Sequence, residues 1–165
     1  MTRLALFTSL VLLSSCGALR FDVKQPIPAQ EVPGASWANL LTSLLPAPIR
    51  LSIDVELETE KQGTGPATSA GLDALTLRAL EGNGGTFDFL DAVSVSIGGA
   101  GLPTQEVARL RPVPRGQREL TFDVSPGVDL LPYLKQGATL STSVTGAVPS
   151  STFTFDGEVV VEIRI

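Results

Sequence analysis

The sequence predicts an all-β fold, an antiparallel β-sandwich of seven to eight short strands with one or two short helices. Apolar and polar residues alternate with a period of two in most segments, which is the pattern of strands that bury one face. Gly and Pro, 16 and 12 of the 165 residues, cluster between these segments and mark turns. Many short alternating runs separated by turns are typical of a sandwich, and the length suits one domain.

The clearest alternation lies in Arg50–Lys61, which we expect to be a half-buried strand. Its apolar residues share one face: Leu51, Ile53, Val55 and Leu57. Its acidic residues share the other face: Asp54, Glu56, Glu58 and Glu60. Two weaker strands, Arg20–Gln25 and Gln105–Arg111, are followed by prolines and are expected at sheet edges.

Further runs with the same alternation are expected to be strands: Leu75–Ala79, Phe87–Ile97, Glu119–Val124, Thr139–Val144, Ser151–Phe155 and Glu158–Ile165. The last two runs are separated by Asp156-Gly157, a dipeptide suited to a type I′ hairpin turn. The inward faces of the runs predict these core residues: Ile53, Val55, Leu77, Val95, Phe122, Val144, Val161 and Ile163.

Two segments have helical rather than strand periodicity. Ser36–Leu45 places Trp37 and four leucines on one helical face, and Val128–Leu134 has the length of one or two helical turns. We consider two roles for the patch around Trp37: it covers an open end of the sandwich, or it inserts into a membrane interface. We favour the first, because the patch has no basic residue. The whole pattern resembles the immunoglobulin-like and C2-like sandwiches that are common in cell envelopes.

The first residues have the organisation of an export signal. One positive charge at Arg3 precedes a ten-residue apolar run, which is too short to cross a bilayer stably. The run ends in Leu13-Ser14-Ser15-Cys16, which resembles the lipobox of bacterial lipoproteins. The resemblance implies that residues 1–15 are removed as a signal peptide and that Cys16 is joined to a lipid. It also implies a bacterial envelope location, and Gly17 rather than Asp after the Cys favours the outer membrane.

After cleavage we expect a single β-sandwich domain, residues 16–165, held to the membrane by the lipid on Cys16. Residues 16–19 are the expected tether. Alternatively, the proline-rich stretch 17–49 is a longer flexible tether. We favour a short tether, because Phe21 and Val23 alternate like an edge strand and a long tether would expose Trp37 to water.

Composition excludes several functions. With no His, the chain lacks the residue needed for Ser-His-Asp or Cys-His catalysis, and its net charge of −5 disfavours nucleic-acid binding. The glycine-rich run Gly98–Gly101 is followed by Leu102-Pro103 rather than a helix, so a hairpin is expected instead of a phosphate loop. We expect no enzyme, cofactor or metal, and no catalytic residue.

Two acidic groups could be mistaken for cation sites. Alternate residues of a strand lie about 6.6 Å apart, so the row from Asp54 to Glu60 is expected to be a solvated face, with Arg109 and Arg111 as possible ion-pair partners. Asp88 and Asp91 lack the ligand spacing of a calcium loop and are expected to cap a turn.

The function we expect is that of a non-enzymatic binding or structural module of the envelope, with a protein or polymer partner. The first alternative is a carrier that holds an acyl chain or other apolar ligand between its sheets. The second, a carboxylate-dependent hydrolase, is disfavoured because Trp37 and Tyr133 are the only Trp and Tyr available to stack on a sugar.

Overall fold

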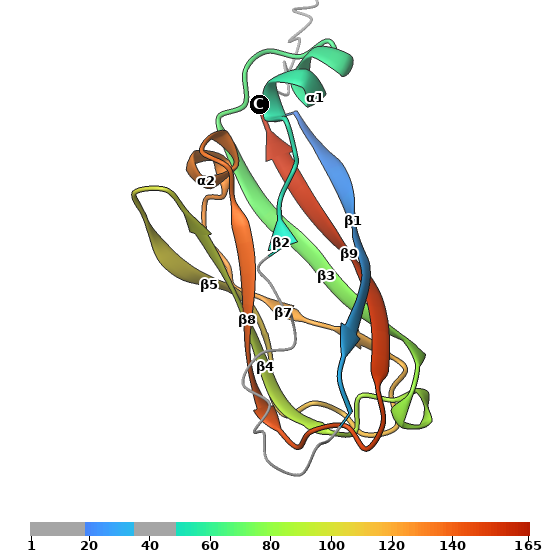
Figure 1. The fold of residues 1–165 in the computed structure, drawn as a ribbon. Coiled ribbons are helices and arrows are strands. Elements are labelled where there is room, and N and C mark those ends of the chain that lie inside the picture. Colours follow the sequence, from blue (N-terminus) through green and yellow to red (C-terminus); the bar gives the residue numbers. More distant parts are fainter. Residues whose placement is uncertain (1–18, 35–48) are drawn as a thin grey trace, which may run out of the picture.

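The chain folds into two packed antiparallel sheets, seen in a computed structural model that describes residues 19–34 and 49–165 (Figure 1). The all-β sandwich predicted from the sequence is confirmed. The described strands are β1 (Arg20–Val32), β2 (Ile49–Arg50), β3 (Ser69–Glu81), β4 (Leu90–Gly99), β5 (Leu102–Leu110), β6 (Glu119–Thr121), β7 (Asp123–Val124), β8 (Thr139–Gly146) and β9 (Phe153–Arg164). The described helices are α1 (Val55–Lys61), η1 (Asn83–Gly85) and α2 (Leu131–Lys135).

The four-stranded sheet has the order β1-β9-β3-β6. Its long central strand β9 pairs with β1 on one side, from Arg20 opposite Arg164 to Val32 opposite Phe153. On the other side β9 pairs with β3, where Ser69 is also opposite Arg164. The edge position of β1 allows it to contain Pro26 and Pro28, because a proline cannot donate to a neighbouring strand.

The five-stranded sheet has the order β2-β8-β4-β5-β7. Strands β6 and β7 are one continuous stretch that leaves one sheet and joins the other at Phe122. Before this residue, Leu120 is opposite Leu77 in β3; after it, Val124 is opposite Ala108 in β5. The predicted run Glu119–Val124 is therefore divided between the two layers. The described residues form nine strands rather than the seven or eight expected.

The interior is filled by the inward faces of both sheets. All eight predicted core residues are buried: Ile53, Val55, Leu77, Val95, Phe122, Val144, Val161 and Ile163. At the end of the sandwich opposite α1 they are joined by four phenylalanines. Phe153 lies with its ring centre 5.0 Å from that of Phe87 and 4.9 Å from that of Phe89, both edge to face. Such edge-to-face pairs stabilise the fold by more than the burial of their apolar area alone.

The prediction that Arg50–Lys61 is one strand is wrong beyond Arg50, because β2 ends there and residues 51–54 form no regular structure. Burial alternates from Leu51 to Val55 as expected, but the chain becomes helical at Val55. Asp54 Oδ1 accepts a hydrogen bond from the backbone N–H of Leu57, 3.1 Å away, so this residue caps α1. Glu, Leu and Lys favour helix, and the cap resolves the competition between the two patterns.

The prediction of a hairpin turn at Asp156-Gly157 is also wrong, because β9 passes through both residues without interruption. Gly157 pairs with Leu77 of β3 and with Ile27 of β1. A glycine in a central strand marks a close approach of the neighbouring strands rather than a turn.

The prediction that Gln105–Arg111 is an edge strand is wrong, because β5 lies between β4 and β7 and pairs with both. Several other local predictions are confirmed, and one lies outside the described residues. Phe21 and Val23 lie in edge strand β1 and pack on the core. Helix α2 begins within the predicted helical segment Val128–Leu134 and ends one residue beyond it. The hairpin at Gly98–Gly101 joins β4 to β5, and the Tyr133 hydroxyl donates to the Pro103 carbonyl, 2.7 Å away. The helix predicted around Trp37 lies outside the described residues.

Candidate functional site

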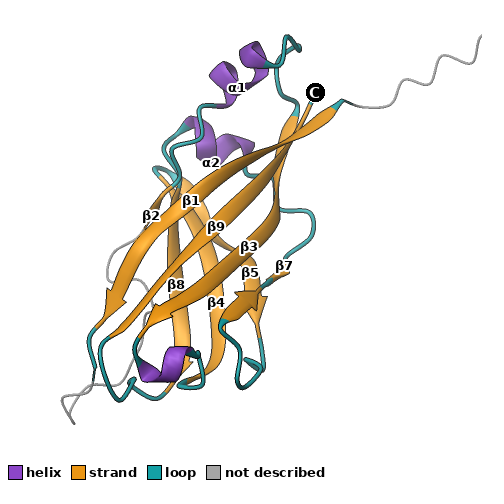
Figure 2. Ribbon diagram, turned by 90° about the vertical axis from the view of Figure 1, so that its right-hand side faces the viewer, coloured by secondary structure: helices purple, strands orange, loops and turns teal. Residues whose placement is uncertain are grey.

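One end of the sandwich gathers the start of β1, the C-terminus, α1 and α2, while η1 lies at the opposite end (Figures 1 and 2). The backbone N–H of Ile165 donates to the carbonyl of Leu19, 2.9 Å away, and the N–H of Thr68 donates to that of Arg164, 2.8 Å away. We call this the N-terminal end of the sandwich. Cys16, the predicted lipid attachment site, lies outside the described residues, three positions before Leu19.

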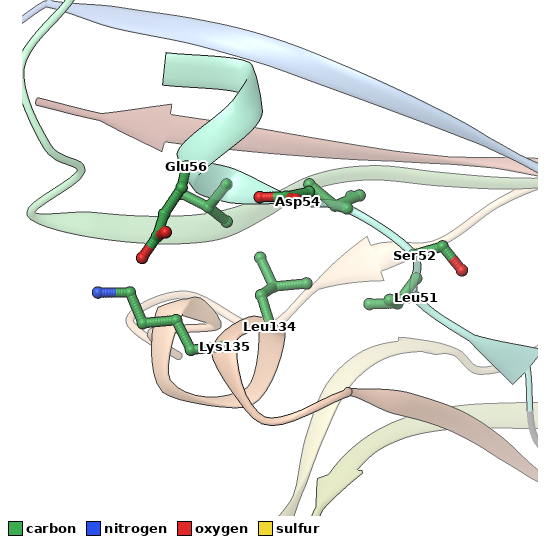
Figure 3. Close-up of a pocket in the computed structure, with 8 residues that line it drawn as sticks. Leu51, Ser52, Asp54, Glu56, Leu134 and Lys135 are labelled. Carbon is green, nitrogen blue, oxygen red and sulfur yellow. The ribbon is translucent and has the colours of Figure 1, made fainter. Parts of the chain in front are cut away.

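A groove of about 500 Å³ opens between α1 and α2 at this end (Figure 3). Four buried apolar side chains line its floor: Leu51, Ile53, Val55 and Leu134. Ser52, Asp54, Glu56 and Lys135 complete its lining. A second hollow of about 380 Å³ adjoins it on the side of the α1–β3 loop and shares Val55, Glu56 and Lys135 with it.

Charges of opposite sign lie on the two sides of this groove. The carboxylate of Glu56 and the ammonium group of Lys135 point toward one another (Figure 3). Among the described residues neither takes part in an ion pair. Glu58 differs, because its Oε1 lies 2.7 Å from Lys61 Nζ on the same helix. The groove therefore has the exposed ammonium group of Lys135 on one side of an apolar floor and the exposed carboxylates of Asp54 and Glu56 on the other.

The groove rests on a short helix that is fastened to the sheet below. Asp129 Oδ1 accepts hydrogen bonds from the backbone N–H groups of Ala70 and Leu131, each 3.0 Å away. The N–H of Leu130 donates to the carbonyl of Ala70, 2.7 Å away. These bonds join the start of α2 to β3 and hold Lys135 in position at the helix end.

The acidic row predicted on a strand is instead carried by the helix and its cap. Asp54, Glu56 and Glu60 are exposed and Glu58 is half-buried, so the expectation of a solvated face holds although its geometry was wrong. Arg109 and Arg111 do not lie opposite this row. They line a different hollow on the five-stranded sheet, and Arg109 Nη1 lies 3.9 Å from Glu106 Oε1.

The outward face of the five-stranded sheet is rich in hydroxyl groups. Ser94 is opposite Ser143 on β8 and opposite Arg109 on β5, which is itself opposite Asp123 on β7. Two residues further along β4, Ser96 is opposite Ser141 on β8 and opposite Glu106 on β5. We define the hydroxyl face as the following residues: Ser94, Ser96, Glu106, Arg109, Arg111, Asp123, Ser141, Ser143 and Thr145. It contains a hollow of about 490 Å³.

Asp88 and Asp91 hold a turn, as expected. Asp88 Oδ1 accepts from the backbone N–H of Gly116, 2.5 Å away, and Asp91 Oδ1 lies 2.8 Å from Arg115 Nη2. Arg115 also donates to the carbonyl oxygen of Asp88. Within residues 19–34 and 49–165, no group of three or more His, Cys, Asp and Glu side chains is arranged to hold a metal ion.

Sequence reasoning missed two features: the groove, and a side-chain contact between the edge strands β1 and β2 beside it. The Gln25 side chain of β1 donates to the carbonyl of Arg50, 3.0 Å away, and accepts from the N–H of Ser52, 2.8 Å away. It thereby connects the edges of the two sheets. A lone Gln in an alternating strand gives no signal of such a bridge.

No family model matches the chain, and neither the curated proteins nor the solved structures contain a significant match to it. Among the described residues, no helix has the length and apolar character needed to cross a bilayer.

Proposed function

We propose that this chain is a bacterial cell-envelope lipoprotein, anchored by a lipid on Cys16 and acting through its β-sandwich as a non-enzymatic binding or structural module. The observation that carries the proposal is the position of β1. The first strand begins at Arg20, four residues after Cys16, and pairs with the central strand β9 from its first residue. A lipid on Cys16 would hold the folded domain at the membrane, which favours an envelope role. Gly17 favours the outer membrane.

The filled interior supports a module rather than a carrier of an apolar ligand. The largest side chains between the sheets are almost completely buried, with Phe87, Phe153 and Phe155 each at 0% exposure. An acyl chain between the sheets would have to displace such residues, and interiors packed in this way tolerate little extra volume.

The carboxylates of the groove give little support to a hydrolase. Asp54 is engaged as the cap of α1, and its partner in the groove, Glu56, faces Lys135 (Figure 3). A pair of carboxylates for glycoside hydrolysis must flank the bond to be cleaved, with one acting as an acid and the other as a base or nucleophile.

The hydroxyl face is the surface we propose for the envelope partner. Its Ser and Thr side chains can both donate and accept hydrogen bonds, and the guanidinium groups of Arg109 and Arg111 can bind carboxylates or phosphates in pairs of bonds. A polar protein surface or an envelope polymer fits this chemistry.

Two measurements test the proposal. Mass spectrometry of the mature protein is expected to give an N-terminus at Cys16 that carries acyl groups, and Cys16→Ala should abolish the modification and release the protein from membranes. An unmodified Cys16 in the mature protein would contradict the anchor.

Partner capture from intact envelopes tests the module. The combined variant Arg109→Ala and Arg111→Ala is expected to lose partners that the unaltered protein retains. Arg78→Ala, on the outward face of the other sheet, is the matched control and should retain them. Equal capture by all three proteins would exclude the hydroxyl face as the binding surface.

A further inference from the structure

The length of chain between Cys16 and the first described residue limits how far the domain can stand from the bilayer. Three Cα-to-Cα steps separate Cys16 from Leu19, and each step spans at most about 3.6 Å, so the two residues lie within about 11 Å. If Cys16 carries a lipid, as proposed above, Leu19 lies within reach of the headgroup layer.

The exposed apolar side chains at the N-terminal end fit this position. Leu19 is 61% exposed and Leu57, on the outer side of α1, is 46% exposed. Of the large hydrophobic side chains exposed in the described part of the chain, only Leu80 lies elsewhere. It is near the far end of β3, roughly 35–40 Å from the Ser69 end at about 3.3 Å per residue.

The groove between α1 and α2 opens at this same end, and its charges select among headgroups. An anionic headgroup would meet Lys135 but also the carboxylates of Asp54, Glu56 and Glu60 along α1. A zwitterionic headgroup carries a phosphate and an ammonium group a few bonds apart. Such a headgroup can satisfy a cation and a carboxylate that face one another and have no ion-pair partner among the described residues.

We infer that the groove between α1 and α2 faces the bilayer in which Cys16 is anchored and binds the amine-phosphate headgroup of an aminophospholipid. Lys135 binds the phosphate, and Glu56 accepts hydrogen bonds from the ammonium group. Leu57 lies at the level of the headgroups beside the occupied groove. This inference rests on the proposed lipid anchor and adds to it the orientation of the domain and the lipid it recognises.

The orientation is tested with one label at each end of the sandwich. The chain has one cysteine, Cys16, which lipidation blocks, so Leu57→Cys and Leu80→Cys each provide a single reactive thiol. Each lipidated variant is labelled with a polarity-sensitive fluorophore and reconstituted in vesicles of phosphatidylethanolamine and phosphatidylcholine. We expect a blue shift at position 57 and none at position 80. Equal emission at the two positions would overturn the inference.

The headgroup is tested with the label at position 57 in three kinds of vesicle. Phosphatidylethanolamine should give the largest shift, because its ammonium group donates hydrogen bonds that the quaternary amine of phosphatidylcholine cannot donate. Phosphatidylglycerol, which has no amine, should give the smallest. Glu56→Gln and Lys135→Gln should each remove the preference, whereas Lys61→Gln, outside the groove, should retain it. The same response in all three lipids would overturn the headgroup assignment.

Mass spectrometry of the same samples separates this inference from the anchor on which it rests. If the samples carry lipid on Cys16 but show no difference between positions 57 and 80, only the inference fails. If Cys16 is unmodified in protein isolated from cells, both the inference and the proposed function fail.

Discussion

Gly157 lies opposite Leu77 in the middle of the four-stranded sheet, at a point where the neighbouring strands leave no room for a side chain. A Cβ atom on Gly157 would lie 2.8 Å from Leu77 Cδ2 and 2.3 Å from the carbonyl oxygen of Thr76. The second contact involves backbone, which cannot give way without disturbing β3. The need for this glycine comes from its neighbours and not from a turn.

We therefore expect Gly157→Ala to destabilise the fold by about 1–3 kcal/mol, the usual cost of overpacking a well-filled site. Denaturant unfolding measures the change. Gly71→Ala is the matched control, since Gly71 also lies in this sheet and a Cβ there would meet no atom within 4 Å. An equal, small effect of both substitutions would contradict the close approach at Gly157.

Truncation of Phe122 tests the point where the chain passes from one sheet to the other. Phe122 is 4% exposed, and its N–H donates to the Leu75 carbonyl, 3.1 Å away. We expect Phe122→Ala to lower the free energy of unfolding by about 3–5 kcal/mol, mainly through the cavity it leaves. Leu80→Ala, at an exposed leucine, should change it by less than about 0.5 kcal/mol. Similar values for the two variants would mean that the chain does not cross through the core here.

Asp54→Ala tests the helix that replaced the predicted strand. Loss of an N-cap carboxylate costs about 1 kcal/mol, and the amide protons of α1 should exchange faster with solvent. Glu60→Ala, at an exposed position of the same helix, removes a carboxylate but no cap and should leave exchange nearly unchanged. Protection that is the same in both variants would exclude the capping role of Asp54.

The ion pairs of Glu162 at the N-terminal end of the sandwich predict that stability depends on pH. Arg164 Nε donates to Glu162 Oε1, 2.5 Å away, and Arg20 Nη1 lies 3.4 Å from Oε2. The hydrogen bond from Arg164, aided by the charges of both arginines, lowers the pKa of Glu162 below its ordinary value of 4.5. A carboxylate whose pKa is lowered by folding stabilises the fold fully above its unfolded-state pKa, and this contribution is lost as the pH falls through the folded-state pKa.

We therefore expect Glu162→Gln to be less stable than the unaltered protein at neutral pH, and the difference to shrink below about pH 4.5. Thermal unfolding between pH 7 and pH 3 measures it. Glu60→Gln, which removes a carboxylate with no ion pair among the described residues, should show no such convergence. A difference that stays constant with pH would contradict the ionised pair.

The sequence by itself determined the fold class and the core, because burial of alternate residues is a local property of a strand. Leu77, Val95 and Ile163 lie inside for the reason that their runs predict. Pro26 and Pro28 lie in an edge strand because they cannot donate to a neighbour. The lipobox at Cys16 is likewise a local motif, and it remains a prediction.

Only the tertiary structure decided which of two permitted local structures a segment adopts. Residues 54–61 satisfy both strand alternation and helix propensity, and burial of Val55 and Thr59 on one side of a capped helix selected the helix. Asp156-Gly157 suits a turn, but β1 and β3 on either side made the same glycine part of a central strand. The groove joins residues 51–56 to residues 134–135, nearly 80 positions apart. Contacts between such distant segments depend on how the sheets pack, and no local pattern in either segment records them.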